Sequence, residues 1–231
     1  MRRVLDVARI QTINPFLTIG LPLVVLGLVL LLNLATFAVI GGPSDGDRTT
    51  GALLALYVMM GIAPLQTMTQ LFPFALGLGV TRRTFYAATA LVVVAQSAVY
   101  GLVIVIASQV EASTGGWGLG LRFFGLPFLP QGNIAAQWLA VTVPMVVLAS
   151  IGVFVGVVFK RWGQLGVYGA TIGGAALLTG LALLVTGLDG WPAVGGFLAS
   201  QPPLALLAGY PLLIALLFGG TGWLVLRRAT A

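Results

Sequence analysis

The chain of 231 residues contains no cysteine and no histidine, and only 7% of its residues carry a formal charge. Without these residues it has no disulfide, no thiol chemistry, no histidine-based triad and none of the commonest transition-metal ligands. At 59% hydrophobic residues and a mean hydropathy of +1.08, it has too little polar surface for a soluble domain. We therefore expect the bilayer to be its solvent.

The sequence also lacks a phosphate-binding loop, since no glycine-rich stretch ends in Gly-Lys-Ser or Gly-Lys-Thr. The glycine-rich runs at 76–80 and 115–120 adjoin apolar stretches without a strand–turn–helix context, so we reject both as nucleotide sites. All five acidic residues fall at span ends or outside the predicted spans, which disfavours paired-carboxylate catalysis in the membrane. We predict a chain that is not an enzyme and holds no cofactor or metal.

No charged residue lies near the centre of an apolar stretch. Ion-coupled transporters commonly place such residues inside the membrane, although backbone carbonyls can also bind Na⁺. If this chain belongs to a pump, we expect its energy source to lie on another subunit.

Six stretches are long and apolar enough to cross a membrane as helices, which need about 20 residues each. They are Phe16–Ile40, Gly51–Leu78, Thr84–Val110, Ile134–Phe159, Gly163–Gly187 and Leu204–Leu226. The second is interrupted by polar residues and two prolines in PLQTMTQLFPF. We predict an all-α polytopic membrane protein whose residues 1–231 form a single transmembrane domain.

Charge in the loops predicts the orientation of these spans. One set of ends holds nine basic residues and a single acid, Asp6; the basic residues are Arg2, Arg3, Arg9, Arg82, Arg83, Lys160, Arg161, Arg227 and Arg228. The other set holds only two basic residues and four acids, namely Arg48, Arg122, Asp45, Asp47, Glu111 and Asp189. The positive-inside rule then places both termini in the cytoplasm, with the chain in the cell membrane.

The first residues have the pattern of an amphipathic helix. Arg2, Asp6 and Arg9, joined by Arg3, face one side of a helix over 2–13, and Val4, Val7 and Ala8 face another. We predict a helix on the inner membrane surface, the alternative being a disordered tail. Asn14 and Pro15 then predict the start of the first span, with Asn as cap and Pro in the first turn.

Polar side chains inside the second span form a candidate translocation path. Gln66 and Gln70 share a helix face beside Thr67, and Pro64 and Pro73 are expected to bend or loosen the helix around them. Two interpretations stay open, either hydrogen bonds between helices or a path that faces a second copy of the chain. In other spans, Asn33 and the pair Gln96 and Tyr100 favour hydrogen bonding between helices.

Small residues form two seams that allow helices to approach closely. The longer seam lies in the fifth span, with spacings of three and four residues: Gly166, Gly169, Gly173, Ala176 and Gly180. Gly152 and Gly156 form the second, a GxxxG pair in the fourth span. We favour packing inside one subunit over dimerisation for these seams. Whether the outer segments 111–133 and 189–203 re-enter the membrane stays open.

The stretch LFPFALGLGVTRRTFYAAT, residues 71–89, resembles the permease subunits of ABC-2-type ATP-binding cassette transporters, especially the short, six-span actinobacterial kind. In these permeases the second span is followed by a glycine-containing turn, a basic pair and an aromatic start to the third span. The resemblance implies that this turn couples the permease to an ATPase. Its residues here are Gly77, Gly79, Thr81, Arg82, Arg83 and Phe85.

The resemblance also implies the partners of the chain. Two permease copies, identical or different, would assemble with two cytosolic ATPase subunits that bind ATP and Mg²⁺, and the N-terminal helix would approach the ATPase. One departure is that the longest outer loop here joins the third and fourth spans, whereas many relatives enlarge the segment between the fifth and sixth.

Three functions follow from these expectations. The first is an exporter subunit that moves an amphipathic or hydrophobic substrate, as in multidrug efflux. The second is a secondary carrier or channel that works alone, and the third is a membrane scaffold without transport. We expect Thr81 to cap the third span and to stiffen the turn before it.

Overall fold

The computed structural model describes residues 2–40, 48–125, 129 and 132–227. Of the charged residues used to predict orientation, Asp45, Asp47 and Arg228 lie outside this part of the chain. The described part is almost entirely helical, so the all-α prediction is confirmed.

The helices before residue 120 are α1 Arg2–Gln11, η1 Phe16–Gly20, α2 Leu21–Ile40, α3 Leu54–Gln66, η2 Thr67–Leu71, α4 Phe72–Gly77, α5 Arg82–Ser113 and η3 Gly116–Gly120. The later ones are α6 Ile134–Gly187, α7 Trp191–Ser200, η4 Ala205–Gly209 and α8 Tyr210–Arg227. Here η marks a π-helix. Two short strands, β1 Arg48–Thr49 and β2 Leu121–Arg122, pair in parallel.

Four of the described helices are long and apolar enough to cross a membrane, which supports a membrane protein. They are Phe16–Val39, Arg82–Ser113, Ile134–Gly187 and Ala205–Arg227. The path from Leu54 to Gly77 is divided among α3, η2 and α4. Within α6, Gly163 adopts φ +66° and ψ −157°, outside the helical region, so this long element is two helices joined at a sharp bend.

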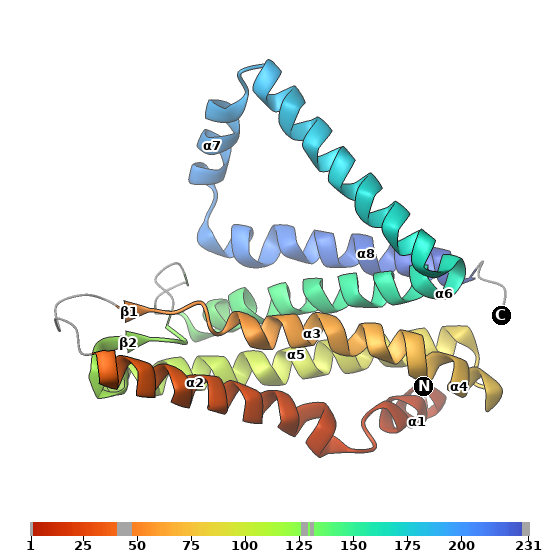
Figure 1. The fold of residues 1–231 in the computed structure, drawn as a ribbon, viewed down its shortest axis with the longest axis horizontal. Coiled ribbons are helices and arrows are strands. Elements are labelled where there is room, and N and C mark those ends of the chain that lie inside the picture. The colour runs from red at the N-terminus through yellow and green to blue at the C-terminus, as the bar shows by residue number, and fades with distance from the viewer. Residues whose placement is uncertain (1, 41–47, 126–128, 130–131, 228–231) are drawn as a thin grey trace.

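Most helices run side by side in a bundle of α2, α3, α5, α8 and the part of α6 before Gly163 (Figure 1). One buried cluster fills the middle of the bundle around Tyr100, Ile104 and Met145. A second cluster lies near α1 and joins Val7, Phe72, Phe85, Val157 and Leu226. We call it the basic-end cluster, after the end of the bundle described next. These two apolar cores hold the bundle together.

The two ends of the bundle differ in what they carry. The N-terminal helix, the turn between α4 and α5, the bend at Gly163 and the end of α8 gather at one end, which we call the basic end (Figure 1). The strands β1 and β2 and the start of α6 lie at the opposite end (Figure 1). The described residues that the sequence assigned to one side of the membrane therefore meet in space.

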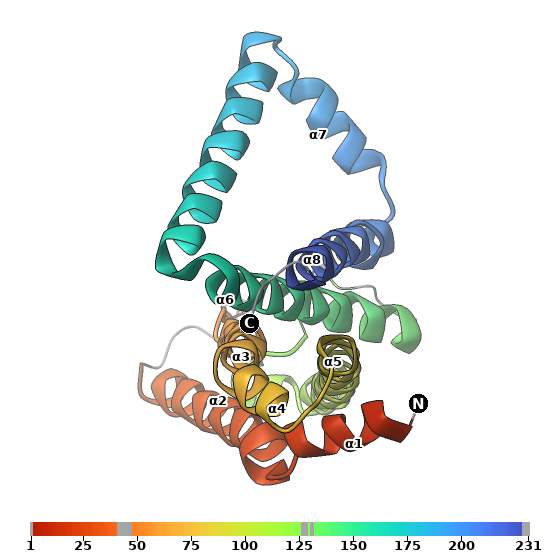
Figure 2. The ribbon, with the colours of Figure 1, turned by 90° about the vertical axis from the view of Figure 1, so that its right-hand side faces the viewer.

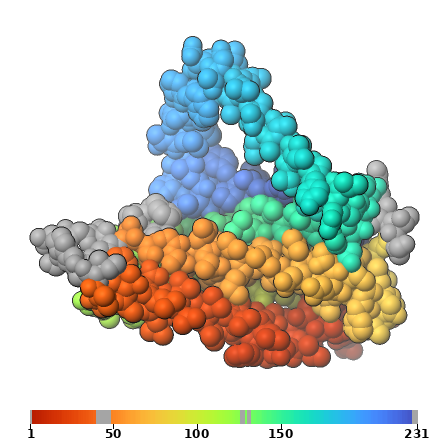
Figure 3. All heavy atoms as spheres, viewed as in Figure 1, coloured from red at the N-terminus to blue at the C-terminus, as the bar shows by residue number. Residues whose placement is uncertain are grey.

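The segment 164–200 leaves the bundle, and we call it the arm. It contains the part of α6 after Gly163 together with α7, and none of its residues is buried. Figure 2 shows the arm extending away from the bundle axis, and Figure 3 shows open space between the arm and the bundle. The polypeptide returns to the bundle only at η4 and α8.

The structure separates the two small-residue seams. A Cβ atom built on Gly152 would overlap the carbonyl oxygen of Gly61, and one on Gly156 would lie 2.6 Å from the Cβ of Met68. Packing within the subunit is therefore confirmed for this pair, which presses α6 against α3.

For the longer seam beyond Gly166, the structure shows no packing within the described part of the subunit. Cβ atoms built on Gly169, Gly173 and Gly180 would meet nothing within 4 Å, and Ala176 is exposed. Gly166 is the exception, because a Cβ atom there would overlap the Cβ of Trp162 and lie 3.5 Å from a methyl group of Val158, both before the bend. The physical reason is the bend at Gly163, which directs this helix away from the bundle.

Candidate ligand pocket and partner-docking turn

A pocket of about 740 Å³ opens beside the second predicted span. Its walls come from α1, from η1 with the start of α2, from α3 to α4, and from α5. Eight of the residues that line it have polar side chains: Gln11, Thr18, Gln66, Thr67, Gln70, Thr89, Gln96 and Tyr100. None of the described lining residues carries a charge, so the pocket offers hydrogen bonds without formal charge.

Prolines explain why three helical segments are widened, two of them, η1 and η2, at the pocket. The π-helices η1, η2 and η4 each end two residues before a proline, which is Pro22, Pro73 or Pro211. A proline has no N–H and its ring crowds the carbonyl four residues earlier, so a wider turn relieves both problems. The expected loosening near Pro73 is confirmed, because Thr67–Leu71 is such a turn.

The carbonyl group of Thr18 shows how the pocket is fixed. It lies four residues before Pro22, which has no N–H to give it. The side chains of Gln96 and Tyr100 both donate to this oxygen, each at 2.9 Å. The expected hydrogen bonding between helices is therefore confirmed for this pair, and α5 is tied to η1 at the pocket wall. Asn33 bonds to the carbonyl of Val29 and accepts from Thr50.

The N-terminal helix forms one end of the pocket. Val7 and Ala8 are buried in the basic-end cluster, and the amide of Gln11 donates to the hydroxyl of Thr89 on α5 at 2.9 Å. The charged residues on the opposite face are all exposed: Arg2, Arg3, Asp6 and Arg9. The helix is thus amphipathic as predicted, although it ends at Gln11. The amide oxygen of Asn14 accepts from the N–H of Leu17, so this predicted cap is confirmed.

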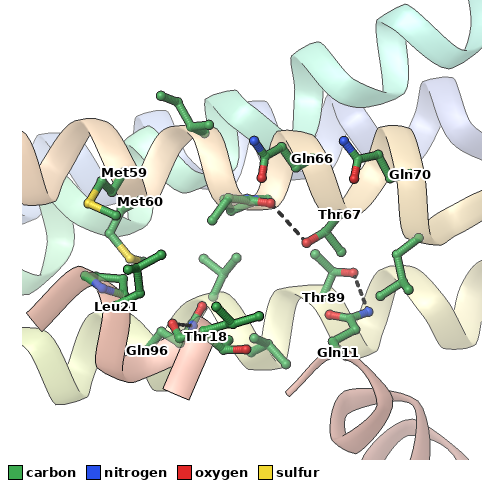
Figure 4. Close-up of a pocket in the computed structure, with 18 of the residues that line it drawn as sticks. Gln11, Thr18, Leu21, Met59, Met60, Gln66, Thr67, Gln70, Thr89 and Gln96 are labelled. Carbon is green, nitrogen blue, oxygen red and sulfur yellow. Dashed lines mark hydrogen bonds between the residues drawn. The ribbon is translucent and has the colours of Figure 1, made fainter. Parts of the chain in front are cut away.

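Gln66 and Gln70 lie one turn apart on one wall of the pocket, across from Gln11 and Thr89 (Figure 4). Both are exposed, and neither side chain has a hydrogen-bond partner among the described residues. Thr67, between them, donates its hydroxyl to the carbonyl of Ala63. The polar patch predicted from the sequence therefore borders this pocket.

The turn after the second predicted span closes α4 with hydrogen bonds. Gly79 has φ +79°, which glycine adopts without strain. Its N–H donates to the carbonyl of Leu76, and the N–H of Val80 donates to the carbonyl of Ala75. This pair of bonds is the Schellman motif, in which glycine ends a helix and satisfies its last carbonyls.

Thr81 begins α5 at the other side of the same turn. It is extended, and its hydroxyl accepts from the N–H of Thr84 at 3.2 Å, so the predicted cap is confirmed. Phe85 is fully buried and its ring lies 5.2 Å from that of Phe72, whereas Arg83 is exposed and Arg82 is half-buried. Phe85 is thus an anchor of the turn, and the basic pair stands at its outer side.

Sequence reasoning missed the role of Glu111 at the opposite end. This residue was expected outside the third span, but α5 continues to Ser113 and leaves Glu111 only 3% exposed. Its carboxylate accepts from the indole of Trp117 and from the backbone N–H groups of three successive residues, Phe123, Phe124 and Gly125. Glu111 therefore fixes part of the segment 111–133 onto the end of the bundle.

Comparison with protein-family models, curated proteins and solved structures finds no match to this chain. Of the predicted site residues, the structure brings Gln66, Thr67 and Gln70 together at the pocket and places the turn and the N-terminal helix at the same end of the bundle. It leaves the seam of the arm apart from both.

Proposed function

We propose that this chain is the permease subunit of an ATP-binding cassette exporter in the cell membrane. In this proposal it crosses the bilayer six times, keeps both termini in the cytoplasm, and moves an amphipathic or hydrophobic substrate. ATP hydrolysis occurs on separate subunits.

The helix lengths support six spans. The bend at Gly163 divides α6 into parts of about 43 Å and 36 Å at about 1.5 Å per residue, and each exceeds the roughly 30 Å of a hydrocarbon core. The helical path from Leu54 to Gly77 is long enough by the same estimate. The gathering of basic residues at one end of the bundle supports a cytoplasmic location for that end.

The observation that carries the proposal is the construction of the turn from Gly77 to Phe85. A Schellman motif stiffens one side, the Thr81 cap stiffens the other, and Phe85 anchors it in the basic-end cluster. The N-terminal helix packs on the same cluster through Val7 and Ala8. A rigid turn that is tied to the helix bundle and carries the half-buried Arg82 and the exposed Arg83 suits a partner whose movement must be transmitted to the spans.

The partner in this proposal is a cassette ATPase with acidic groups that pair with Arg82 and Arg83. A second permease copy completes the assembly. The arm supports this part of the proposal because none of its residues is buried and Cβ atoms on Gly169, Gly173 and Gly180 would meet nothing within 4 Å among the described residues.

The test is the double substitution Arg82→Glu with Arg83→Glu, followed by purification in mild detergent. We expect the co-purifying ATPase to be lost, or its ATP hydrolysis to become independent of substrate transport. The matched control is Lys160→Glu with Arg227→Glu, which changes the charge at the same end by the same amount and should leave coupling intact. Coupled transport that is unchanged in a correctly inserted Arg82→Ala with Arg83→Ala variant would contradict the docking role.

A stand-alone carrier is the second candidate, because four segments of the same chain line one pocket. Flux driven by an ion gradient in liposomes that contain only this protein would favour it. Co-purifying partners without substrate-dependent ATP hydrolysis would instead favour a scaffold.

A further inference from the structure

We propose that the pocket binds an uncharged amphiphile whose amide or hydroxyl end is recognised by the carboxamides of Gln66 and Gln70. This inference deepens the proposed function and rests on it in one respect: the bound ligand is a transported substrate only if the chain is a permease. The binding site itself is a property of the single chain and is tested without a partner.

The hydrogen bonds of the pocket leave two carboxamides for a ligand. The amide nitrogen of Gln11 is used by Thr89, and that of Gln96 is used by the carbonyl of Thr18. Gln66 and Gln70 line the same space, and their side chains have no hydrogen-bond partner among the described residues. Each carboxamide both donates and accepts, so together they match a group such as a primary amide or a hydroxyl.

The absence of charge among the described lining residues selects against ionic ligands. A charged group that leaves water needs an opposite charge or several hydrogen bonds to offset its lost hydration. The charged residues of α1 do not supply this, because they lie on its exposed face while Gln11 borders the pocket. A neutral polar group loses much less hydration and is satisfied by the two carboxamides.

The remaining lining residues suit a hydrocarbon chain. Met59 and Met60 on α3 line the part of the pocket that is away from Gln70 (Figure 4). Their thioether side chains adapt to irregular apolar ligands. Leu17 on η1 and Phe74 on α4 also line the pocket and are 56% and 60% exposed. The pocket therefore opens at the surface of the bundle between η1 and α4, where apolar side chains would face lipid.

The test uses oleamide that carries a photoactivatable diazirine on its chain, with the purified protein in nanodiscs. We expect labelled peptides from η1, from the path 59–74 and from α5. Three competitors share the same chain and differ in the head group: oleamide, oleyl sulfate and oleyl trimethylammonium. Oleamide should compete at a concentration at least about tenfold lower than either permanently charged compound. A tenfold difference corresponds to about 1.4 kcal/mol of binding free energy. Equal competition by all three, or labelling confined to the arm, would overturn the proposal.

Two pairs of substitutions identify the recognising groups. Gln66→Leu with Gln70→Leu should weaken oleamide competition about tenfold, which corresponds to the loss of one or two hydrogen bonds. Gln66→Glu with Gln70→Glu should reverse the preference toward oleyl trimethylammonium. The control is Gln164→Glu, an exposed glutamine on the arm, which should change neither result. Wild-type competition in the leucine variant would refute the assignment.

The two proposals fail in distinguishable ways. Loss of the ATPase from the Arg82 and Arg83 variant with normal oleamide labelling would support the transporter and the ligand site together. An ATPase that co-purifies while oleamide labels no pocket peptide would overturn the ligand site and leave the proposed function in place. Because both glutamines are exposed, their replacement removes no buried contact, and circular dichroism of each variant checks the fold.

Discussion

The two halves of α6 make different use of the same small-residue pattern. Before Gly163, Gly152 and Gly156 bring the helix against α3, with no room for a Cβ atom at Gly152. After Gly163, Gly169 and Gly173 repeat the four-residue spacing in a helix with no buried residue. The spacing of small residues therefore permits close packing, and the direction of the backbone at the bend decides whether a partner helix is present.

The bundle is also fixed at both of its ends, and the arm has no comparable support. At the basic end, Arg161 donates to the carbonyl of Val225 near the end of α8, next to the cluster that holds α1. At the opposite end, Glu111 collects four hydrogen bonds from the segment after α5. Within the arm, the hydrogen bond from the indole of Trp191 to Thr186 joins neighbouring turns, and the ring of Phe197, 6.2 Å from that of Tyr210, contacts the start of α8.

Removing the carboxylate at the opposite end should have the largest effect on the bundle. Glu111→Ala leaves the N–H groups of Phe123 and Phe124 buried without an acceptor, and each such group costs about 1–3 kcal/mol. We expect the free energy of unfolding to fall by about 2–6 kcal/mol, measured by reversible unfolding of the isolated chain in mixed micelles. Glu111→Gln keeps one acceptor oxygen, which can still accept from the N–H groups of Phe123 and Phe124, and should lose less. Equal, small losses in both variants would show that the segment is held in another way.

A methyl group at the packed seam should have the next largest effect. Gly152→Ala places a Cβ atom on the carbonyl oxygen of Gly61, so α3 and α6 must separate. Forced rearrangement of a packed interior costs about 1–3 kcal/mol, and we expect a loss of that size in the same unfolding measurement. Gly27→Ala on α2 is the control, because a Cβ atom there would meet nothing within 4 Å. A stable Gly152→Ala variant would mean that the two helices do not approach closely at this point.

Helix positions and local caps were predictable because they depend on nearby residues. Asn14 and Thr81 cap the helices that they precede, and Gly79 ends α4, as short-range geometry requires. The amides of Gln66 and Gln70 were found from their spacing alone. That spacing did not indicate which surface they face, since this depends on how α1, η1 and α5 pack around them.

Long-range features were missed for a related reason. Glu111 looked like an ordinary acid at a span end, and only the path of the segment through Phe123 to Gly125 reveals it as a buried acceptor. The prolines carry a signal for such partners in the sequence itself. Pro22 leaves the carbonyl of Thr18 without a backbone N–H partner, so donors on a neighbouring helix, here Gln96 and Tyr100, bond to it instead.

The smallest effect on unfolding, and the sharpest test of the comparison, comes from the arm. Gly169→Ala with Gly173→Ala adds two methyl groups where nothing lies within 4 Å. Alanine is favoured over glycine in a helix by up to about 1 kcal/mol, so unfolding of the isolated chain should be unchanged or slightly more difficult, opposite in sign to Gly152→Ala.

The same pair should weaken self-association if a second copy covers the arm as proposed. Because close helix approach requires small residues, we expect the dissociation constant of the dimer, followed by sedimentation in detergent, to rise about tenfold, equivalent to about 1.4 kcal/mol. Unfolding that becomes easier by as much as in Gly152→Ala would instead show that the arm packs on its own bundle. In that case the bend at Gly163 would be a hinge within one subunit, and the two halves of α6 would share a single mode of packing.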